Sequence, residues 1–157
     1  MDTFPTRNIC LVNPEIPQNT GSIGRLAAAT RTKLHLIKPL GFSLSDRYLK
    51  RAGLDYWPFL EFYVHESFDE MLGTFPTAPR LAFFSTKAEK LLWDTPPVDI
   101  LVFGRETAGL PDFLRERYKE DFYKIPMFHP GVRSLNLANS VGIALYQQIG
   151  QMRYYSV

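Results

Sequence analysis

The sequence predicts a single α/β domain over residues 1–157, with a mostly parallel sheet and helices on both of its faces. Short apolar runs alternate along the chain with segments of helical periodicity, which is the pattern of strand–helix–strand units. Polar or glycine-rich loops follow several of the apolar runs, where open α/β sheets bind their ligands. Apolar residues make up 45% of the chain and charged residues 22%, as in ordinary globular proteins.

Two strands and a connecting helix are expected near the amino terminus. Residues 8–13 (NICLVN) and 33–37 (KLHLI) are short runs rich in branched apolar side chains, which favours strands. Residues 21–31 (GSIGRLAAATR) show helical periodicity, and Asn19 or Thr20 can cap the helix that they form. The order strand, helix, strand predicts the first unit of a parallel sheet.

The middle of the chain predicts two short helices and a strand between them. Residues 44–53 favour a helix, and residues 59–64 (FLEFYV) alternate as a half-buried strand does. Residues 67–73 begin with Ser67 and carry Glu70 three positions later, which is the capping pattern of a helix start. The alternation of element types therefore continues.

The second half of the chain predicts three strands and two helices. The strands are expected at 80–85, 99–104 and 121–126, where aromatic and branched residues gather. The helices are expected at 110–118 and over roughly 137–152.

Several classes of protein do not fit this sequence. The apolar runs are shorter than the roughly 20 residues that span a bilayer, and the amino terminus lacks a secretory signal pattern. Cys10 is the only cysteine, and His35, His65 and His129 lack the spacing of metal ligands. No phosphate-binding loop or nucleophile elbow occurs. We therefore expect a cytoplasmic protein that uses no metal.

Basic residues gather between Arg25 and Arg51. This segment holds seven basic residues and one acidic residue, whereas the rest of the chain holds eleven basic and fifteen acidic residues. Gathered positive charge favours the binding of a polyanion such as a nucleic acid. The composition alone fits a solvated basic surface equally well.

Two of the polar loops follow apolar strands and carry charged side chains. The first loop, Asn13–Gly24, ends just before Arg25, for which a surface ion pair is the simpler interpretation. In the second, Gly104 and Gly109 permit a tight turn or close approach to a ligand. Glu106 lies between these glycines and by itself fits an exposed loop residue.

A third loop opens the last expected helix with an unusual number of polar residues. They are Arg133, Ser134, Asn136, Asn139 and Ser140. An ordinary cap at Ser134, with Asn136 in the first helical turn, explains one or two of them but not five. Ala138 and Gly142 are four residues apart on one face of the helix, so a neighbouring backbone can approach there.

Three stretches of the sequence, NxGSIGRLAAA, FGRETAGLP and IPM…RSLNLANSVGIALY, resemble in order and spacing the signature motifs of the SPOUT superfamily of RNA methyltransferases. The resemblance extends from about Ile9 to Tyr146. The stretches NPEIPQNTGSIGRL and LKRAGLDYW further resemble the TrmL (YibK) branch, whose members have no added RNA-binding domain. Arg105 stands where that branch often has proline, and Gly24 stands where an apolar residue is common.

The resemblance implies a trefoil knot near the carboxyl terminus, S-adenosylmethionine as cofactor, S-adenosylhomocysteine as product, no metal, and a homodimer. The implied cofactor contacts are Phe84, Ser85, Thr86, Gly104, Ile125, Met127, Ser134 and Leu135. The implied reaction set is Arg25, Asn19, Glu106, Ser134 and Asn136. The implied RNA contacts are Arg25, Lys50 and Arg51, and the implied dimer contacts are Tyr146 and Gly142.

The resemblance also implies the reaction, which is methylation of the ribose 2′-hydroxyl of the wobble nucleotide of tRNA, a cytidine or modified uridine at position 34. Isoacceptors of tRNA-Leu are the expected substrates. The resemblance implies Arg25 as the base, but a guanidinium stays protonated in most proteins. Arg25 is therefore expected to clamp the flanking phosphate and position the hydroxyl, and either a phosphate oxygen or a transiently neutral Arg25 takes the proton. Alternatives are the same methylation at another tRNA or rRNA site, or a non-catalytic RNA-binding factor on this fold.

Overall fold

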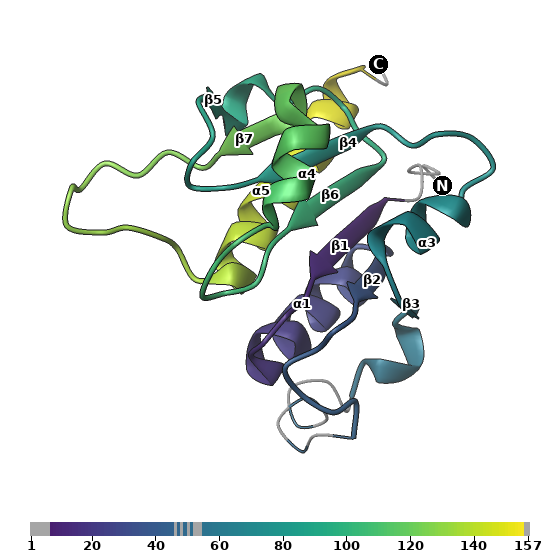
Figure 1. The fold of residues 1–157 in the computed structure, drawn as a ribbon. Coiled ribbons are helices and arrows are strands. Elements are labelled where there is room, and N and C mark those ends of the chain that lie inside the picture. Colours follow the sequence, from purple (N-terminus) through teal and green to yellow (C-terminus); the bar gives the residue numbers. More distant parts are fainter. Residues whose placement is uncertain (1–6, 46, 48, 50, 52–54, 156–157) are drawn as a thin grey trace.

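A parallel sheet forms the centre of the computed structural model, which describes residues 7–155 except 46, 48, 50 and 52–54 (Figure 1). In the described residues the sheet has seven strands in the order β3-β2-β1-β6-β4-β7-β5, and every strand runs parallel to its neighbours. The strands are β1 (Asn8–Val12), β2 (Lys33–Ile37), β3 (Phe62–His65), β4 (Leu81–Phe84), β5 (Lys90–Leu91), β6 (Ile100–Phe103) and β7 (Phe122–Lys124). The predicted mostly parallel sheet is confirmed.

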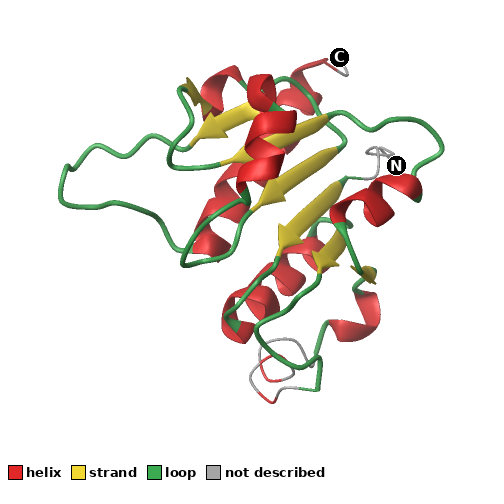
Figure 2. Ribbon diagram, viewed as in Figure 1, coloured by secondary structure: helices red, strands yellow, loops and turns green. Residues whose placement is uncertain are grey.

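Helices cover both faces of this sheet, as predicted (Figure 2). They are α1 (Pro17–Ala29), α3 (Phe68–Gly73), α4 (Asp112–Arg117) and α5 (Leu137–Tyr155), with 3₁₀ turns η1 (Trp57–Phe59), η2 (Leu92–Asp94) and η3 (Lys119–Asp121). The helix expected at 44–53 lies largely outside the described residues, although Arg47, Leu49 and Arg51 are helical. None of the described helices is both long and apolar enough to cross a membrane.

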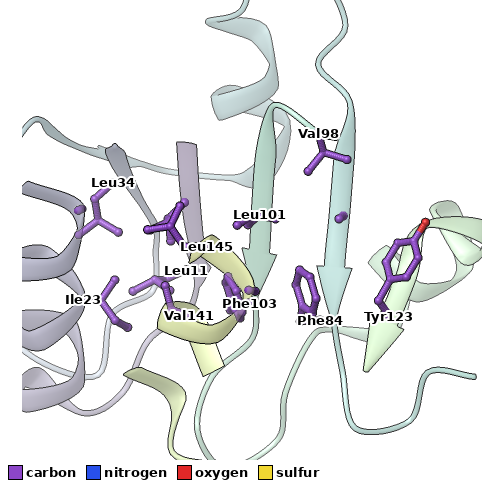
Figure 3. Packing of buried hydrophobic residues seen from close by; sticks show 14 of the residues in the cluster. Leu11, Ile23, Leu34, Phe84, Val98, Leu101, Phe103, Tyr123, Val141 and Leu145 are labelled. Atoms are coloured by element: carbon purple, nitrogen blue, oxygen red, sulfur yellow. The ribbon is translucent and has the colours of Figure 1, made fainter. Parts of the chain in front are cut away.

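Alternate residues of the strands build two separate cores, one on each face. In β1, Ile9 and Leu11 belong to the cluster that contains Ile23 of α1 and Val141 of α5 (Figure 3). The next residue along, Cys10, belongs to the cluster of α3 and α4 on the opposite face. Burial of each large apolar side chain stabilises the fold by roughly 1.5–3 kcal/mol. Helices α1 and α5 are thereby fixed side by side on one face.

Helix α1 begins earlier than predicted, because Pro17 takes the first helical position. Ile16 is the N-cap residue and makes no side-chain cap bond. The expectation that Asn19 or Thr20 caps this helix is therefore wrong, since both residues lie buried in its first turn. The predicted cap of α3 is confirmed, because the Oγ of Ser67 accepts a hydrogen bond from the amide of Glu70 at 3.0 Å.

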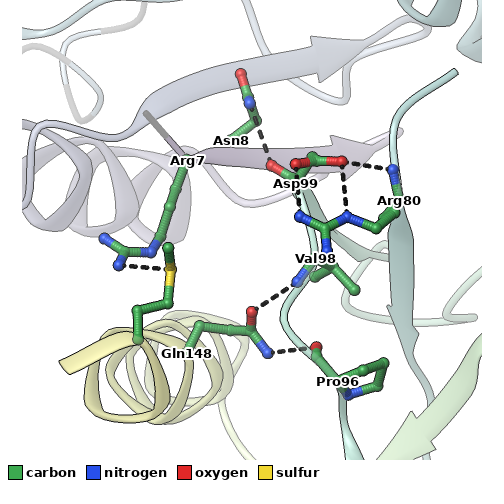
Figure 4. A network of polar contacts seen from close by, with 8 residues as sticks. Arg7, Asn8, Arg80, Pro96, Val98, Asp99 and Gln148 are labelled. Carbon is green, nitrogen blue, oxygen red and sulfur yellow. Dashed lines mark hydrogen bonds and ion pairs between the residues drawn. The ribbon is translucent and has the colours of Figure 1, made fainter. Parts of the chain in front are cut away.

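Helix α5 is tied to the segment that precedes β6 by a buried amide side chain. Gln148 accepts a hydrogen bond from the backbone amide of Val98 and donates one to the carbonyl of Pro96, each at 3.0 Å (Figure 4). Next to it, Asp99 forms an ion pair with Arg80 at 3.3 Å. The two bonds of Gln148 fix the long last helix after the chain has left β7 through the loop 125–136. The trefoil knot in this part of the chain stays a prediction.

A chain of polar side chains crosses the interior of the sheet near β2. His35 lies between His65 and Asn8, with 2.9 Å from its Nδ1 to the Nε2 of His65 and 2.9 Å from its Nε2 to the Oδ1 of Asn8. Burial is the main cause that lowers the pKa of His35 to about 4, and the charges of His65 and Lys33 lower it further. His35 is therefore a neutral part of the core.

Candidate active site

A cavity of about 650 Å³ opens at the carboxyl ends of β4, β6 and β7. The loops that follow β6 and β7 lie beside the start of α5 (Figure 1). The cavity is lined by residues 84–87, 103–109 and 134–137, together with Ile16, Asn19, Arg115, Ile125, Met127 and Ser140. Parts of all three predicted polar loops thus meet in one wall, at the edge of the sheet where ligands bind in such folds.

The loop after β6 folds back on itself and needs glycine at its first position. A Cβ atom on Gly104 would lie 2.1 Å from the carbonyl carbon of Gly109 and 2.3 Å from the nitrogen of Leu110. The amide of Gly109 donates to the carbonyl of Arg105 at 2.9 Å, and Gly109 has a φ of +67°. The bare backbone of Gly104 therefore forms part of the cavity wall, where only a residue without a side chain fits.

The carboxylate of Glu106 holds the start of α1. Its Oε2 accepts a hydrogen bond from the amide of Glu15 at 2.9 Å, and its Oε1 accepts one from the amide of Ile16 at 3.3 Å. A negative charge is favourable at this position because it faces the amino end of a helix. Glu106 was placed in the implied reaction set. The geometry shows a carboxylate with both oxygens engaged in positioning the first loop.

Glu15, in the first loop, makes a reciprocal contact with the loop that follows β6. Its Oε1 accepts hydrogen bonds from the hydroxyl of Thr107 at 2.7 Å and from the amide of Thr107 at 3.1 Å. These bonds are the main cause that lowers the pKa of the Glu15 carboxyl below its ordinary value. Neither Glu15 nor Thr107 was predicted from the sequence. The one available signal was an acidic residue enclosed by Pro14 and Pro17, just before a helix.

Asn136 links the third loop to the first. Its Oδ1 accepts a hydrogen bond from the amide of Asn139 at 3.2 Å, so Asn136 caps helix α5. Its Nδ2 donates to the Oδ1 of Asn19 at 3.0 Å. The interpretation that made Ser134 the cap and Asn136 a first-turn residue is wrong. Asn136 both caps α5 and contacts Asn19 of α1, because it ends an extended loop directly at the start of the helix.

The remaining polar residues at the start of α5 divide between the helix and the cavity. The hydroxyl of Ser140 donates to the carbonyl of Asn136 at 3.1 Å, which tightens the first helical turn. Ser134 and Ser140 also line the cavity. Arg133 is exposed on the loop that precedes them. The polar entrance of this helix thus combines a cap, a bond to α1 and a cavity wall.

The structure places all eight of the implied cofactor contacts in the wall of the cavity. They are Phe84, Ser85, Thr86, Gly104, Ile125, Met127, Ser134 and Leu135. Apolar side chains alternate there with hydroxyl groups and exposed backbone, and the volume lies within the range of pockets that bind nucleoside-sized molecules. Of the implied reaction set, Asn19, Glu106, Ser134 and Asn136 lie in the same wall.

Arg25 lies outside this group. It is exposed on α1, and its guanidinium carbon lies 5.8 Å from the ring centroid of Tyr56. The hydroxyl of Tyr56 in turn donates to the carbonyl of Gly21 at 2.6 Å. Eight residues separate Arg25 from Pro17, which places it about 12 Å along the helix from the cavity end. The structure therefore separates Arg25 from the other implied reaction residues.

The basic segment does not form one face. Lys33 is paired with Glu61 at 3.8 Å, and Lys38 is paired with Glu66 at 2.9 Å. Arg31 lies between α1 and β2, and Lys33 begins β2, so both are at the edge of the sheet opposite the cavity. Arg51 is exposed, and Lys50 lies outside the described residues.

The two implied dimer contacts differ in their surroundings. A Cβ atom on Gly142 would meet the Cδ2 of Leu26 at 3.8 Å, so this face of α5 packs against α1 of the same chain. Tyr146 is 56% exposed, and the nearby Ile143 is 41% exposed. The dimer interface stays a prediction. Within the described residues, no group of three or more histidine, cysteine, aspartate or glutamate side chains is placed to hold a metal ion.

The chain is similar to known proteins over most of its length. The model of the SpoU rRNA Methylase family matches residues 6–146. A protein of Synechocystis sp. is 47% identical over 148 residues, which cover 92% of this chain and 96% of the relative. A protein of Burkholderia ambifaria named tRNA (cytidine(34)-2′-O)-methyltransferase is 44% identical over 144 residues, covering 89% and 92% of the two chains.

Solved structures show the same fold. One described as "Structural insights into the 2-OH methylation of C/U34 on tRNA" has a TM-score of 0.88 and 45% identity, and the match covers 94% of this chain and 97% of that chain. The AviRb methyltransferase of Streptomyces viridochromogenes, solved with AdoMet, has a TM-score of 0.82 and 24% identity, covering 92% of this chain and 57% of that chain. The second likeness concerns the fold alone.

Proposed function

Because this chain belongs to the SpoU methylase family, we propose that it transfers a methyl group from S-adenosylmethionine to the ribose 2′-hydroxyl of the wobble nucleotide of tRNA. The target is a cytidine or a modified uridine at position 34, in tRNA-Leu isoacceptors. Relatives that are 44–45% identical to this chain over 144 residues are named tRNA (cytidine(34)-2′-O)-methyltransferase. The meeting of three distant loops in one cavity is the structural observation that carries the proposal.

The cavity fits S-adenosylmethionine in size and in chemistry. Phe84, Ile125 and Leu135 offer apolar surface for an adenine ring, and the backbone of the loop at Gly104 can approach a ligand without a side chain between them. When bound, the cofactor supplies a methyl group on a sulfonium centre, which is already activated for displacement. The protein then has to bind, align and exclude water.

The hydrogen bonds around the cavity fix the three loops of its wall relative to one another. The carboxylate of Glu106 holds the first loop, and Asn136 holds Asn19. In the proposal, Asn19, Ser134 and Asn136 orient the ribose beside the cofactor. Glu106 acts as a positioning residue through the start of α1.

We assign Arg25 to the RNA rather than to the cofactor, because it lies outside the cavity wall. Its planar guanidinium is suited to a bidentate grip on a phosphate next to the target ribose. Arg51 is the second described candidate for a phosphate contact. The proposal includes a homodimer in the cytoplasm, with Tyr146 and Ile143 on the exposed face of α5 as interface residues.

The proposal is tested with purified protein, radiolabelled S-adenosylmethionine and an anticodon stem-loop of tRNA-Leu. We expect methyl transfer to the ribose 2′-hydroxyl at position 34 and none to the same stem-loop with 2′-deoxyribose there. Ribosomal RNA fragments serve as competing substrates, since the matching family description refers to rRNA. Transfer only to rRNA, or equal transfer to the deoxy stem-loop, would contradict the proposal.

A further inference from the structure

The aromatic side chain of Phe128 projects into solvent on a loop that lines the cavity. Phe128 is 91% exposed, the largest exposed fraction among the large apolar side chains described. It directly follows Met127, which lines the cavity, and the same loop returns to the cavity wall at Ser134. Adjacent Cα atoms are 3.8 Å apart, so the ring of Phe128 is anchored within one residue of the cofactor pocket.

The loop behind Phe128 is held by its own turn. The amide of Val132 donates to the carbonyl of His129 at 3.2 Å, and the amide of Gly131 donates to the Nδ1 of His129 at 3.0 Å. A Cβ atom on Gly131 would lie 3.1 Å from the His129 ring. The turn therefore restricts the backbone next to Phe128, which lowers the entropy lost when a ligand orders the loop.

The surroundings of Phe128 favour an anionic ligand. From Phe122 to the end of the chain the sequence contains no aspartate or glutamate, whereas Lys124 and Arg133 flank the loop. Lys87, Arg105 and Arg115 line the cavity next to it. The carboxylate in the same wall, Glu106, is engaged by backbone amides.

An exposed ring among cations is the combination that binds unpaired nucleotides, because the base stacks on the ring and the phosphates contact the basic groups. We propose that the ring of Phe128 stacks on an unpaired base of the nucleotide directly 5′ or 3′ of the methylated one. This inference rests on the proposed function, since it requires an RNA at the cavity mouth. It adds a substrate-positioning residue in the segment 128–132, which none of the three motifs explains.

Replacement of the ring gives the first test. Phe128→Ala weakens binding of the anticodon stem-loop by about five- to 150-fold, the range for loss of one stacked base. Phe128→Leu, which keeps an apolar side chain without a ring, is weakened similarly, and Phe128→Trp keeps wild-type affinity. All three fold, because the ring is exposed. Val132→Ala, at an exposed apolar position of the same loop, is the matched control and stays within about twofold.

A thermodynamic cycle gives the decisive test, with affinity measured by fluorescence anisotropy. Stem-loops that lack the base either 5′ or 3′ of the target nucleotide are compared on wild-type protein and on Phe128→Ala. We expect one of the two abasic RNAs to bind wild type at least about fivefold more weakly than the intact RNA, and to bind both proteins equally. Affinity for S-adenosylmethionine, measured by calorimetry, stays unchanged in Phe128→Ala.

The outcomes separate the two proposals. If wild type binds and methylates the intact stem-loop but neither abasic RNA shows coupling to Phe128, the proposed stacking is wrong and the proposed function stands. If Phe128→Leu binds as tightly as wild type, the ring is not stacked on a base. If wild type neither binds nor methylates the stem-loop, the proposed function fails and the inference fails with it.

Discussion

The cavity wall and the basic segment 25–51 both contain residues that were predicted to be functional, but the two regions differ in how these residues are arranged in space. The wall gathers residues from four distant parts of the chain into one cavity. The basic segment is continuous in sequence, yet the basic side chains that the structure describes in it do not gather at one edge of the sheet. Lys33 and Lys38 are also neutralised by acidic partners.

The difference has a topological cause. In a parallel sheet all carboxyl ends lie at one edge, so loops that follow different strands meet there however far apart they are in sequence. A helix and the strand after it run in opposite directions between the two edges, so a segment that includes both spreads its charges over the molecule. Loop position is therefore a better guide to the site than local charge.

The largest effect is expected from Gly104→Ala, which tests the cavity wall. The new Cβ atom would lie within 2.3 Å of the backbone of Gly109 and Leu110, so the loop has to move. We expect loss of S-adenosylmethionine binding in calorimetry and a decrease of about 3 kcal/mol in the free energy of unfolding. Gly73→Ala is the matched control, because nothing lies within 4 Å of its Cβ position. Normal cofactor binding by Gly104→Ala would show that this backbone does not form the wall.

The next effect concerns His35, a buried residue of the basic segment. Its pKa of about 4 lies below its ordinary value near 6.5, so the unfolded chain takes up the proton first as the pH falls. The contribution of neutral His35 to the free energy of unfolding is therefore complete well above pH 6.5. It decreases by up to about 3 kcal/mol as the pH falls toward 4. Urea unfolding at several pH values measures this decrease. His35→Gln should lack most of it, and an unchanged pH dependence in that variant would assign the effect to other groups.

Arg25→Lys tests whether Arg25, which lies outside the cavity wall, contributes to turnover. The variant keeps the positive charge but loses the planar guanidinium, which can donate two parallel hydrogen bonds to a phosphate. We expect turnover to fall about 100-fold because the RNA is misplaced. Affinity for the cofactor should stay unchanged, since Arg25 does not line the cavity. Arg31→Lys, at the far end of α1, serves as the control with normal turnover. Near-normal turnover of Arg25→Lys would remove Arg25 from the mechanism.

The smallest effect is expected at Lys33, at the edge away from the cavity. Lys33→Gln removes an exposed ion pair and should change RNA affinity by less than about twofold. Lys87→Gln, in the cavity wall, should lower the slope of log affinity against log salt by about 0.7, the value for one contact to a single-stranded phosphate. Equal effects of the two substitutions would mean that RNA also covers the far edge.

Six of the seven described strands and the four α-helices could be predicted, because each has an apolar pattern of its own, whereas β5 is too short to show one. Helix starts were less predictable: Pro17 extended α1, and Asn136 capped α5, since both depend on how a loop approaches the helix. The resemblance identified eight cofactor contacts that all line the cavity, but not Lys87, Thr107 or Arg115 of the same wall. The reciprocal bonds of Glu15 with Thr107 and of Glu106 with the start of α1 join loops about 90 residues apart, and no local pattern encodes such a contact.

The activity proposed for this chain is methylation of the wobble ribose of tRNA. Mass spectrometry of nucleosides from purified tRNA-Leu, taken from cells with and without the gene for this chain, tests it most directly. We expect the 2′-O-methyl group at position 34 to disappear without the chain, to return with the wild-type protein and to stay absent with Gly104→Ala. An unchanged wobble ribose in cells that lack the chain would contradict the claim.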